Sequence, residues 1–163
     1  MAQSDPTEIL LIHHRWANDR LLEACVKLAD EQLDRAFEMG RGTLRKTLTH
    51  VAGAIGRWGD LLADRELRPM LDDQVLSIDE LCAFYDEVTT DFELSVRRHR
   101  PEEIVSRELH GKSYGFTRGG VLTHVMTHGV HHRAQCLNML RKLGVQQLPP
   151  VSVVEWMMMA DPV

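Results

Sequence analysis

Four of the nine histidines fall within the nine positions that run from His124 to His132. An α-helix turns about 100° per residue, so His124, His128 and His132 would share one face, with His131 on the same side. Neutral imidazole is the commonest side-chain ligand for metals, and histidines spaced i, i+4 can bring two nitrogens to one ion. This spacing predicts a metal site. The alternative interpretation is a set of hydrogen-bonded histidines in a helical core.

One helix cannot enclose an ion, so a third ligand should come from a neighbouring helix. His50 is the candidate, because it lies in an apolar helical stretch and shares a face with Ala54 and Trp58. A hydrogen-bonded core histidine is again the alternative. The sequence contains neither the Glu-x-x-His pairs of di-iron bundles nor the His-Glu-x-x-His motif of zinc proteases. A set of three histidines leaves the coordination of the ion open, which is typical of a catalytic site.

Long helices must position these residues, and apolar spacing and capping residues predict four of them. We expect helices over Asp5–Ala29, Thr43–Asp64, Ser77 to just before Pro101, and Gly119–Leu143, with a polar segment over Asp30–Arg41. A short β-hairpin is expected across residues 104–118, and a short helix capped by Ser152 follows near the C-terminus. The predicted fold is an all-α four-helix bundle, most simply with up-down-up-down helices.

Composition limits the classes of function. A chain of 163 residues, 44% hydrophobic and 26% charged, predicts one globular domain over residues 1–163. The net charge of −5, with basic residues scattered among acidic ones, argues against nucleic acid as a partner. We expect no membrane partner and no signal peptide, because the sequence has no long apolar run. Three isolated cysteines predict a reducing, cytoplasmic location and small buried side chains rather than nucleophiles.

Several segments together resemble one family. They are Trp16-Ala17-Asn18 with Leu21-Leu22, the stretch from Thr43-Leu44 to His50, His128-Gly-Val-His-His-Arg-Ala-Gln135, and Leu140-Arg-Lys-Leu-Gly144. Over nearly its whole length the chain resembles the DinB-like superfamily of four-helix bundles, which includes thiol-dependent S-transferases. The third segment is the most specific, and Ala134 stands there where the family usually has glycine.

The resemblance implies one divalent ion per chain, nickel or zinc, held by His50, His128 and His132. On a helix, His131 lies about 60° from the direction of His128, so we expect it behind the ligands or on the surface. His124 lies one turn earlier and could line the pocket or tune a ligand. The resemblance also implies a small-molecule substrate, with the metal activating a low-molecular-weight thiol, and it implies a homodimer. Hydrolysis by an activated water is the simpler chemistry for such an ion.

Other residues are candidate helpers. Arg133 and Gln135 flank the ligands and could orient a substrate, although an inter-helix salt bridge is the alternative for Arg133. Tyr114 and His110 could donate protons if the long connection covers the metal, and are otherwise ordinary loop residues. His13 and His14 could approach the same cavity or face solvent.

Two classes of function therefore remain open. The first is a metal-dependent transferase or hydrolase, and the second is a non-catalytic, dimeric metal-binding bundle with a structural or sensing ion. A pocket beside an open metal position would favour the enzyme, whereas a fourth protein ligand would favour the structural ion.

Overall fold

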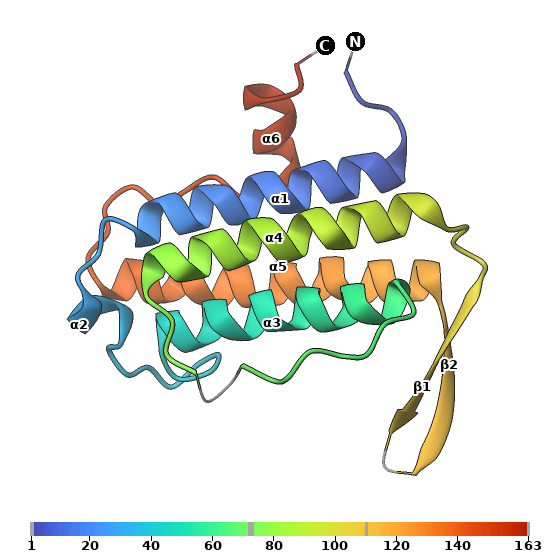
Figure 1. The fold of residues 1–163 in the computed structure, drawn as a ribbon. Helices are drawn as coiled ribbons and strands as arrows, with labels where there is room; N and C mark the ends of the chain where they lie inside the picture. The colour runs from blue at the N-terminus through green and yellow to red at the C-terminus, as the bar shows by residue number, and fades with distance from the viewer. Residues whose placement is uncertain (1, 72–73, 110, 163) are drawn as a thin grey trace.

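The fold is known from a computed structural model that describes residues 2–71, 74–109 and 111–162. It is mostly helical, with one antiparallel two-stranded hairpin, as the sequence predicts (Figure 1). The elements are α1 (Pro6–Cys25), α2 (Asp30–Leu33), α3 (Leu44–Leu62), α4 (Ile78–Arg98), β1 (Ile104–Leu109), β2 (Lys112–Thr117), α5 (Arg118–Lys142) and α6 (Val153–Met159). Residues 104–109 and 112–117 thus form the two strands of the hairpin expected across residues 104–118, with Ile104 paired to Thr117 and Arg107 to Tyr114.

The helices begin where the capping residues predict. Asp5 caps α1, Thr43 caps α3, Ser77 caps α4 and Ser152 caps α6, each accepting a hydrogen bond from a backbone N–H of the first turn. Helix α1 ends one turn earlier than predicted, at Cys25. The polar segment that follows it is not irregular throughout, because Leu33 is fully buried and residues Asp30–Leu33 form the single turn of α2.

Helices α3 and α4 run in the same direction, which corrects the predicted alternation. Arg45, near the start of α3, donates to the carbonyl of Leu76 just before α4, and Gly59 near the end of α3 lies against Phe92 late in α4. Helix α3 is about 28 Å long at 1.5 Å per residue. The connecting residues 63–77 can span about 50 Å when extended, so they can return along the whole helix (Figure 1). We call the described part of this connection, residues 63–71 and 74–77, the crossover segment.

Helix α5 runs antiparallel to α3 and parallel to α1. Arg118 at the start of α5 donates to the carbonyl of Leu62 at the end of α3. On the other side, Arg133 of α5 donates to Asn18 of α1 at 3.0 Å, and Gly129 contacts His14 one turn earlier in both helices. The order of directions is therefore up-down-down-up. The antiparallel contact of α3 with α5 is the one that brings His50 opposite His128.

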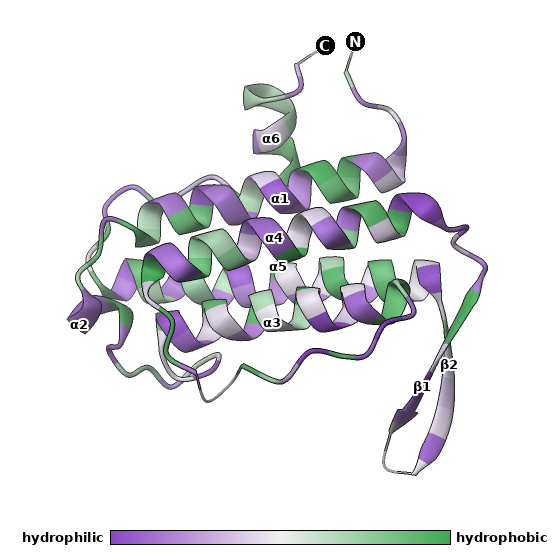
Figure 2. Ribbon diagram, in the orientation of Figure 1, coloured by the Kyte–Doolittle hydropathy of each residue, from purple (hydrophilic) through white to green (hydrophobic). Residues whose placement is uncertain are grey.

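Apolar side chains from the four long helices form the core between them. Hydrophobic and hydrophilic residues alternate along each of these helices in Figure 2, as expected when one face of a helix is buried. The largest fully buried side chains include Leu11, Leu21, Leu48, Ile55, Phe92, Met139 and Leu140. Cys25 and Cys136 are buried among them, as predicted, whereas Cys82 is only partly buried. Within the described residues, no helix is both long enough and apolar enough to span a membrane.

Ion pairs fix the crossover segment against α3. The carboxylate of Asp60, which is almost fully buried, accepts hydrogen bonds from the backbone N–H of Arg68 at 2.9 Å and from its Nε at 2.8 Å. Gly56 makes the close approach possible, because a Cβ there would lie 2.9 Å from Cδ of Arg68. Arg57 in turn donates to the carbonyl of Arg68. The segment therefore forms a wall beside the outer face of α3.

Candidate metal centre

Three histidines from two helices converge between α3 and α5. Each of His50, His128 and His132 offers a ring nitrogen, and the three atoms all lie within 4.8 Å of one another. Nε2 of His50 is 3.2 Å from Nε2 of His128. The ring of His132 is 5.0 Å from the ring of His50 and 4.4 Å from that of His128, measured between centroids. The helical spacing and the antiparallel contact of α3 with α5 thus produce the cluster that the sequence predicts.

The distances within the cluster fit a metal ion. Zinc binds imidazole nitrogen at about 2.0–2.1 Å, so two ligands at a tetrahedral angle would be about 3.3 Å apart. The observed 3.2 Å between the Nε2 atoms of His50 and His128 is close to that value. The donor set is purely imidazole, which suits zinc and nickel. We conclude that the residues present fit a divalent ion.

Burial keeps two of these imidazoles neutral, and only a neutral imidazole can bind a metal. The pKa of His128 is lowered to about 4, first by burial and then by the neighbouring His132 and His50. The pKa of His132 is also lowered, again chiefly by burial, although its hydrogen bond to Gln135 opposes the shift. Both ring nitrogens are therefore available at neutral pH without the cost of removing a proton.

Gln135 determines which nitrogen of His132 can face an ion. Nδ1 of His132 donates to Oε1 of Gln135 at 2.7 Å, so the ring carries its proton on Nδ1 and leaves the Nε2 lone pair free. The amide nitrogen of Gln135 also donates to Nε2 of His131 at 3.0 Å. His131 itself is exposed and lies outside the three-histidine cluster. Gln135 thus orients a cluster residue, and His131 is one step further away.

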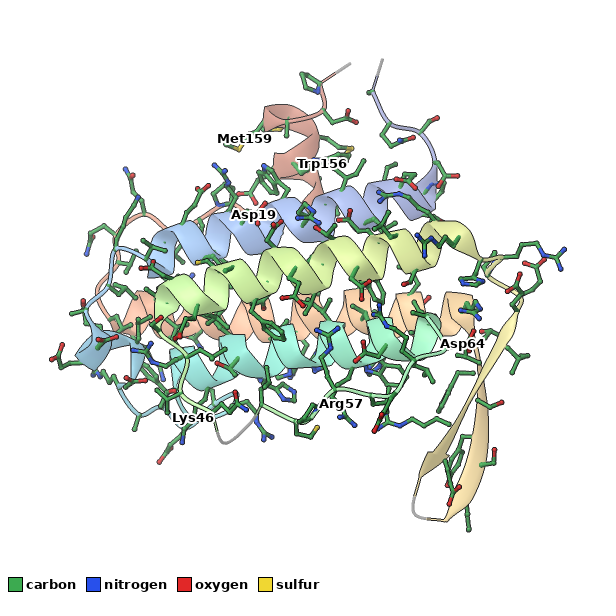
Figure 3. All side chains as sticks on the ribbon, viewed as in Figure 1. Asp19, Lys46, Arg57, Asp64, Trp156 and Met159 are labelled. Carbon is green, nitrogen blue, oxygen red and sulfur yellow. The ribbon has the colours of Figure 1, made fainter. Side chains whose placement is uncertain are left out.

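A cavity of about 290 Å³ opens beside the cluster. Its lining comes from α3, the crossover segment, β1 and α5, and consists of Thr49, His50, Gly53, Ala54, Arg57, Trp58, Met70, Leu71, Arg107, His124 and His128. His124 forms part of the rim, with its ring 4.9 Å from Trp58 in an edge-to-face arrangement. His124 thus lines the pocket, one of the two roles considered for it. Figure 3 shows Arg57 on the side of α3 that faces the crossover segment.

Three polar residues of this cavity were missed by the sequence analysis. Arg57 lies seven residues after His50, two helical turns along the same face, so the helical period of α3 could have identified it. Thr49 precedes His50 and reaches the cavity although it is 2% exposed. Arg107 comes from the hairpin, and no local pattern could have shown that β1 packs beside α3.

His13 and His14 belong to a different environment from the one expected. Both are buried, so they neither face solvent nor line the cavity. His13 bonds through Nε2 to the carbonyl of Val151 at 2.9 Å. His14 lies 3.2 Å from a guanidinium nitrogen of Arg133, which also donates to Asn18. Arg133 is 4% exposed and joins α5 to α1 through these neutral partners, so it forms neither a salt bridge with a described acid nor part of the cavity wall.

The hairpin contributes to the wall of the cavity through β1. Tyr114 on β2 is 43% exposed and stacks on Phe116, and it is not among the residues that line the cavity. Phe116 contacts Trp58 edge to face, with 5.8 Å between the ring centroids. The hairpin therefore packs against Trp58 through Phe116. His110, the other candidate proton donor, lies outside the described residues.

Comparison with known proteins agrees with the resemblance drawn from the sequence. The model of the DinB family matches residues 1–158. The crystal structure of a DinB-like protein from Bacillus cereus is similar, with a TM-score of 0.68 and 20% identity over 88% of this chain and 95% of that one. At this level of identity the likeness shows a shared fold. No curated protein matches the chain. The family match, which covers almost the whole sequence, shows that the chain belongs to the DinB family.

Proposed function

We propose that the protein is a metal-dependent enzyme in which His50, His128 and His132 hold one nickel or zinc ion per chain. The observation that carries this proposal is the position of three converging imidazoles at the edge of a cavity large enough for a small molecule. Such an ion, when bound, acts as a Lewis acid that lowers the pKa of a water or a thiol. The proposed reaction is therefore transfer of a low-molecular-weight thiol, or else hydrolysis.

The remaining residues of the site have supporting roles in this proposal. Gln135 keeps the proton of His132 on Nδ1, so that Nε2 faces the ion. Trp58 and Leu71 form apolar walls that exclude water from the reacting atoms. The proposal also takes the four long helices to form one closed bundle, because α3 packs against α4 and α5, and α1 against the same two helices.

A structural or sensing ion in a non-catalytic bundle is the alternative. Among the described residues, the cluster offers three ligands and no fourth His, Cys, Asp or Glu that could join them. A structural zinc site is normally closed by four protein ligands, whereas a catalytic site keeps a position for water or substrate. The cavity beside the cluster would give a substrate access to that position. The cavity therefore favours the enzyme over the structural ion.

Cobalt substitution tests whether the bound ion has an open position. We expect Co²⁺ to bind with visible absorption bands, and 2-mercaptoethanol to add a sulfur-to-cobalt charge-transfer band in the near ultraviolet. His132→Ala should lose both signals, and His131→Ala, in which an exposed neighbour outside the cluster is removed, should keep them. If 2-mercaptoethanol leaves the cobalt spectrum unchanged, the site is closed and structural, and the catalytic proposal is refuted.

Assembly and location also remain proposals. Apolar side chains of α6 are exposed, including Met158 at 70%, Met159 at 62% and Val154 at 58%. We propose that a second copy of the chain covers this surface, since a monomer gains nothing from leaving it in water. Analytical ultracentrifugation should then show a dimer for the wild type and a monomer for Met158→Glu. Free thiols at all three cysteines fit the proposed cytoplasmic location.

A further inference from the structure

Two arginines line the cavity without an acidic partner. Arg57 on α3 donates to the backbone carbonyl of Arg68, and Arg107 on β1 lines the same cavity. Neither guanidinium forms an ion pair with a described acidic residue, whereas the arginines of the crossover segment, such as Arg65, are paired with aspartates. Both arginines therefore contribute positive charge to the lining of the cavity, and no described acidic residue neutralises it.

The two charges act on each other. Burial, and after it the positive charge of Arg57, lowers the pKa of Arg107 below its ordinary value. The other ionisable groups of the lining are histidines, and no described aspartate or glutamate is among them. Two half-buried cations with no counter-ion repel each other, and an anion placed between them would relieve that repulsion. The wall of the cavity is thus complementary to negative charge.

Other features of the lining indicate the rest of the ligand. The hydroxyl of Thr49 is buried and has no hydrogen-bond partner among the described residues, so it could bond to a polar atom that enters the cavity. Trp58, Met70 and Leu71 offer an aromatic and aliphatic surface. A volume of about 290 Å³ is at the lower end for small-molecule sites. The lining suits a small molecule with an apolar body and a charged head.

We propose that the cavity binds a small organic anion whose carboxylate or phosphate group is held by Arg57 and Arg107, with its other end directed at the three histidines. Guanidinium groups recognise both kinds of oxyanion through paired N–H donors. This inference names the substrate class of the proposed enzyme and rests on that function for the reaction, but binding of the anion needs only the cavity. The arginines are assigned to binding and positioning.

Three ligands with the same aromatic body test the charge requirement. Phenylacetate carries a carboxylate, phenyl phosphate carries a phosphate, and phenylacetamide is neutral. Calorimetric titration of the full chain, with and without zinc, should show at least one of the anions binding about tenfold or more tightly than the amide. The tighter anion identifies the preferred head group. Affinity should fall with added salt, because a half-buried ion pair is partly screened.

Arginine variants distinguish a specific anion site from a nonspecific effect of positive charge on the protein surface. Arg107→Gln and Arg57→Gln should each weaken the anion by about tenfold and leave phenylacetamide unchanged. Arg107→Lys should recover part of the loss, which a merely structural role for the guanidinium would not predict. Lys112→Gln is the matched control, because it removes a positive charge from the same hairpin outside the cavity. Circular dichroism confirms that each variant is folded.

The outcomes distinguish this inference from the proposed function. Anion binding by a protein that binds no metal would support the anion site and refute the metal-dependent enzyme. Normal metal binding with equal affinities for phenylacetate, phenyl phosphate and phenylacetamide would refute the anion site and leave the enzyme proposal standing. Anion affinity unchanged in both arginine-to-glutamine variants would also overturn the inference.

Discussion

Gln135→Leu tests how much the orientation of His132, a proposed metal ligand, contributes to metal binding while leaving His132 itself in place. In the wild type, Oε1 of Gln135 accepts from Nδ1 of His132 at 2.7 Å, and His132 is only 8% exposed. Leucine fills similar space but cannot accept this hydrogen bond. His132 would then lose the interaction that keeps its proton on Nδ1, and its ring would be freer to turn away from His50 and His128.

The expected cost follows from this single lost contact. Removing the partner of a metal-bound histidine typically weakens metal binding by about 10- to 100-fold, or about 1.4–2.8 kcal/mol. Competition with a chromophoric chelator would measure the zinc affinity of the wild type and of Gln135→Leu. His131→Ala is a control that removes the other partner of Gln135, and Gln146→Leu changes an exposed glutamine in a distant loop. Zinc affinity within twofold of wild type in Gln135→Leu would refute the reasoning.

Three further predictions concern the framework that holds the site. Gly129→Ala should lower the free energy of unfolding by about 1–2 kcal/mol in urea titrations, because the added Cβ collides with the buried ring of His14 and the overpacking exceeds the gain in helix propensity; a more stable variant would contradict this packing. Asp60→Asn should make the crossover segment more sensitive to proteolysis, since the carboxylate holds Arg68 there, and unchanged digestion would show that the ion pair is dispensable. Burial, and after it the charge of Arg133, holds the pKa of His14 well below 6.5 in the folded protein. In the unfolded chain His14 binds a proton below about pH 6.5. The free energy of unfolding of the metal-free protein should therefore fall as the pH drops from 7 to 5. His14→Asn should reduce that pH dependence, and an identical slope in the variant would assign it to other groups.

The sequence was most informative where the determinants are local. The spacing of His128 and His132 places both on one helical face whatever the tertiary fold, and side-chain caps such as Ser77 mark helix starts within one turn. The direction of α4 could not be predicted in this way. A connection of about 15 residues can either turn at once or return along the helix, and tertiary contacts such as that of Arg45 with the carbonyl of Leu76 decide between them.

The cavity was harder to predict from the sequence than the three-histidine cluster. Its walls come from four separate elements, and only the parts on α3 and α5 have a helical period that the sequence reveals. Arg107 becomes a cavity residue because the hairpin packs beside α3. The opposite error concerns His13 and His14. Because they lie in a predicted helix of the bundle, the sequence allowed them to approach the cavity. They are instead buried, with hydrogen-bond partners in α5 and near α6.

Metal content is the most direct test of the central claim that His50, His128 and His132 hold an ion. The untagged protein should be purified without chelators, and a second sample reconstituted with nickel or zinc and desalted, before mass spectrometry of both. We expect about one ion per chain, lost in His50→Ala and retained in His131→Ala. Absence of metal under every condition, or full retention in His50→Ala, would contradict the claim and assign these histidines to packing and hydrogen bonding alone.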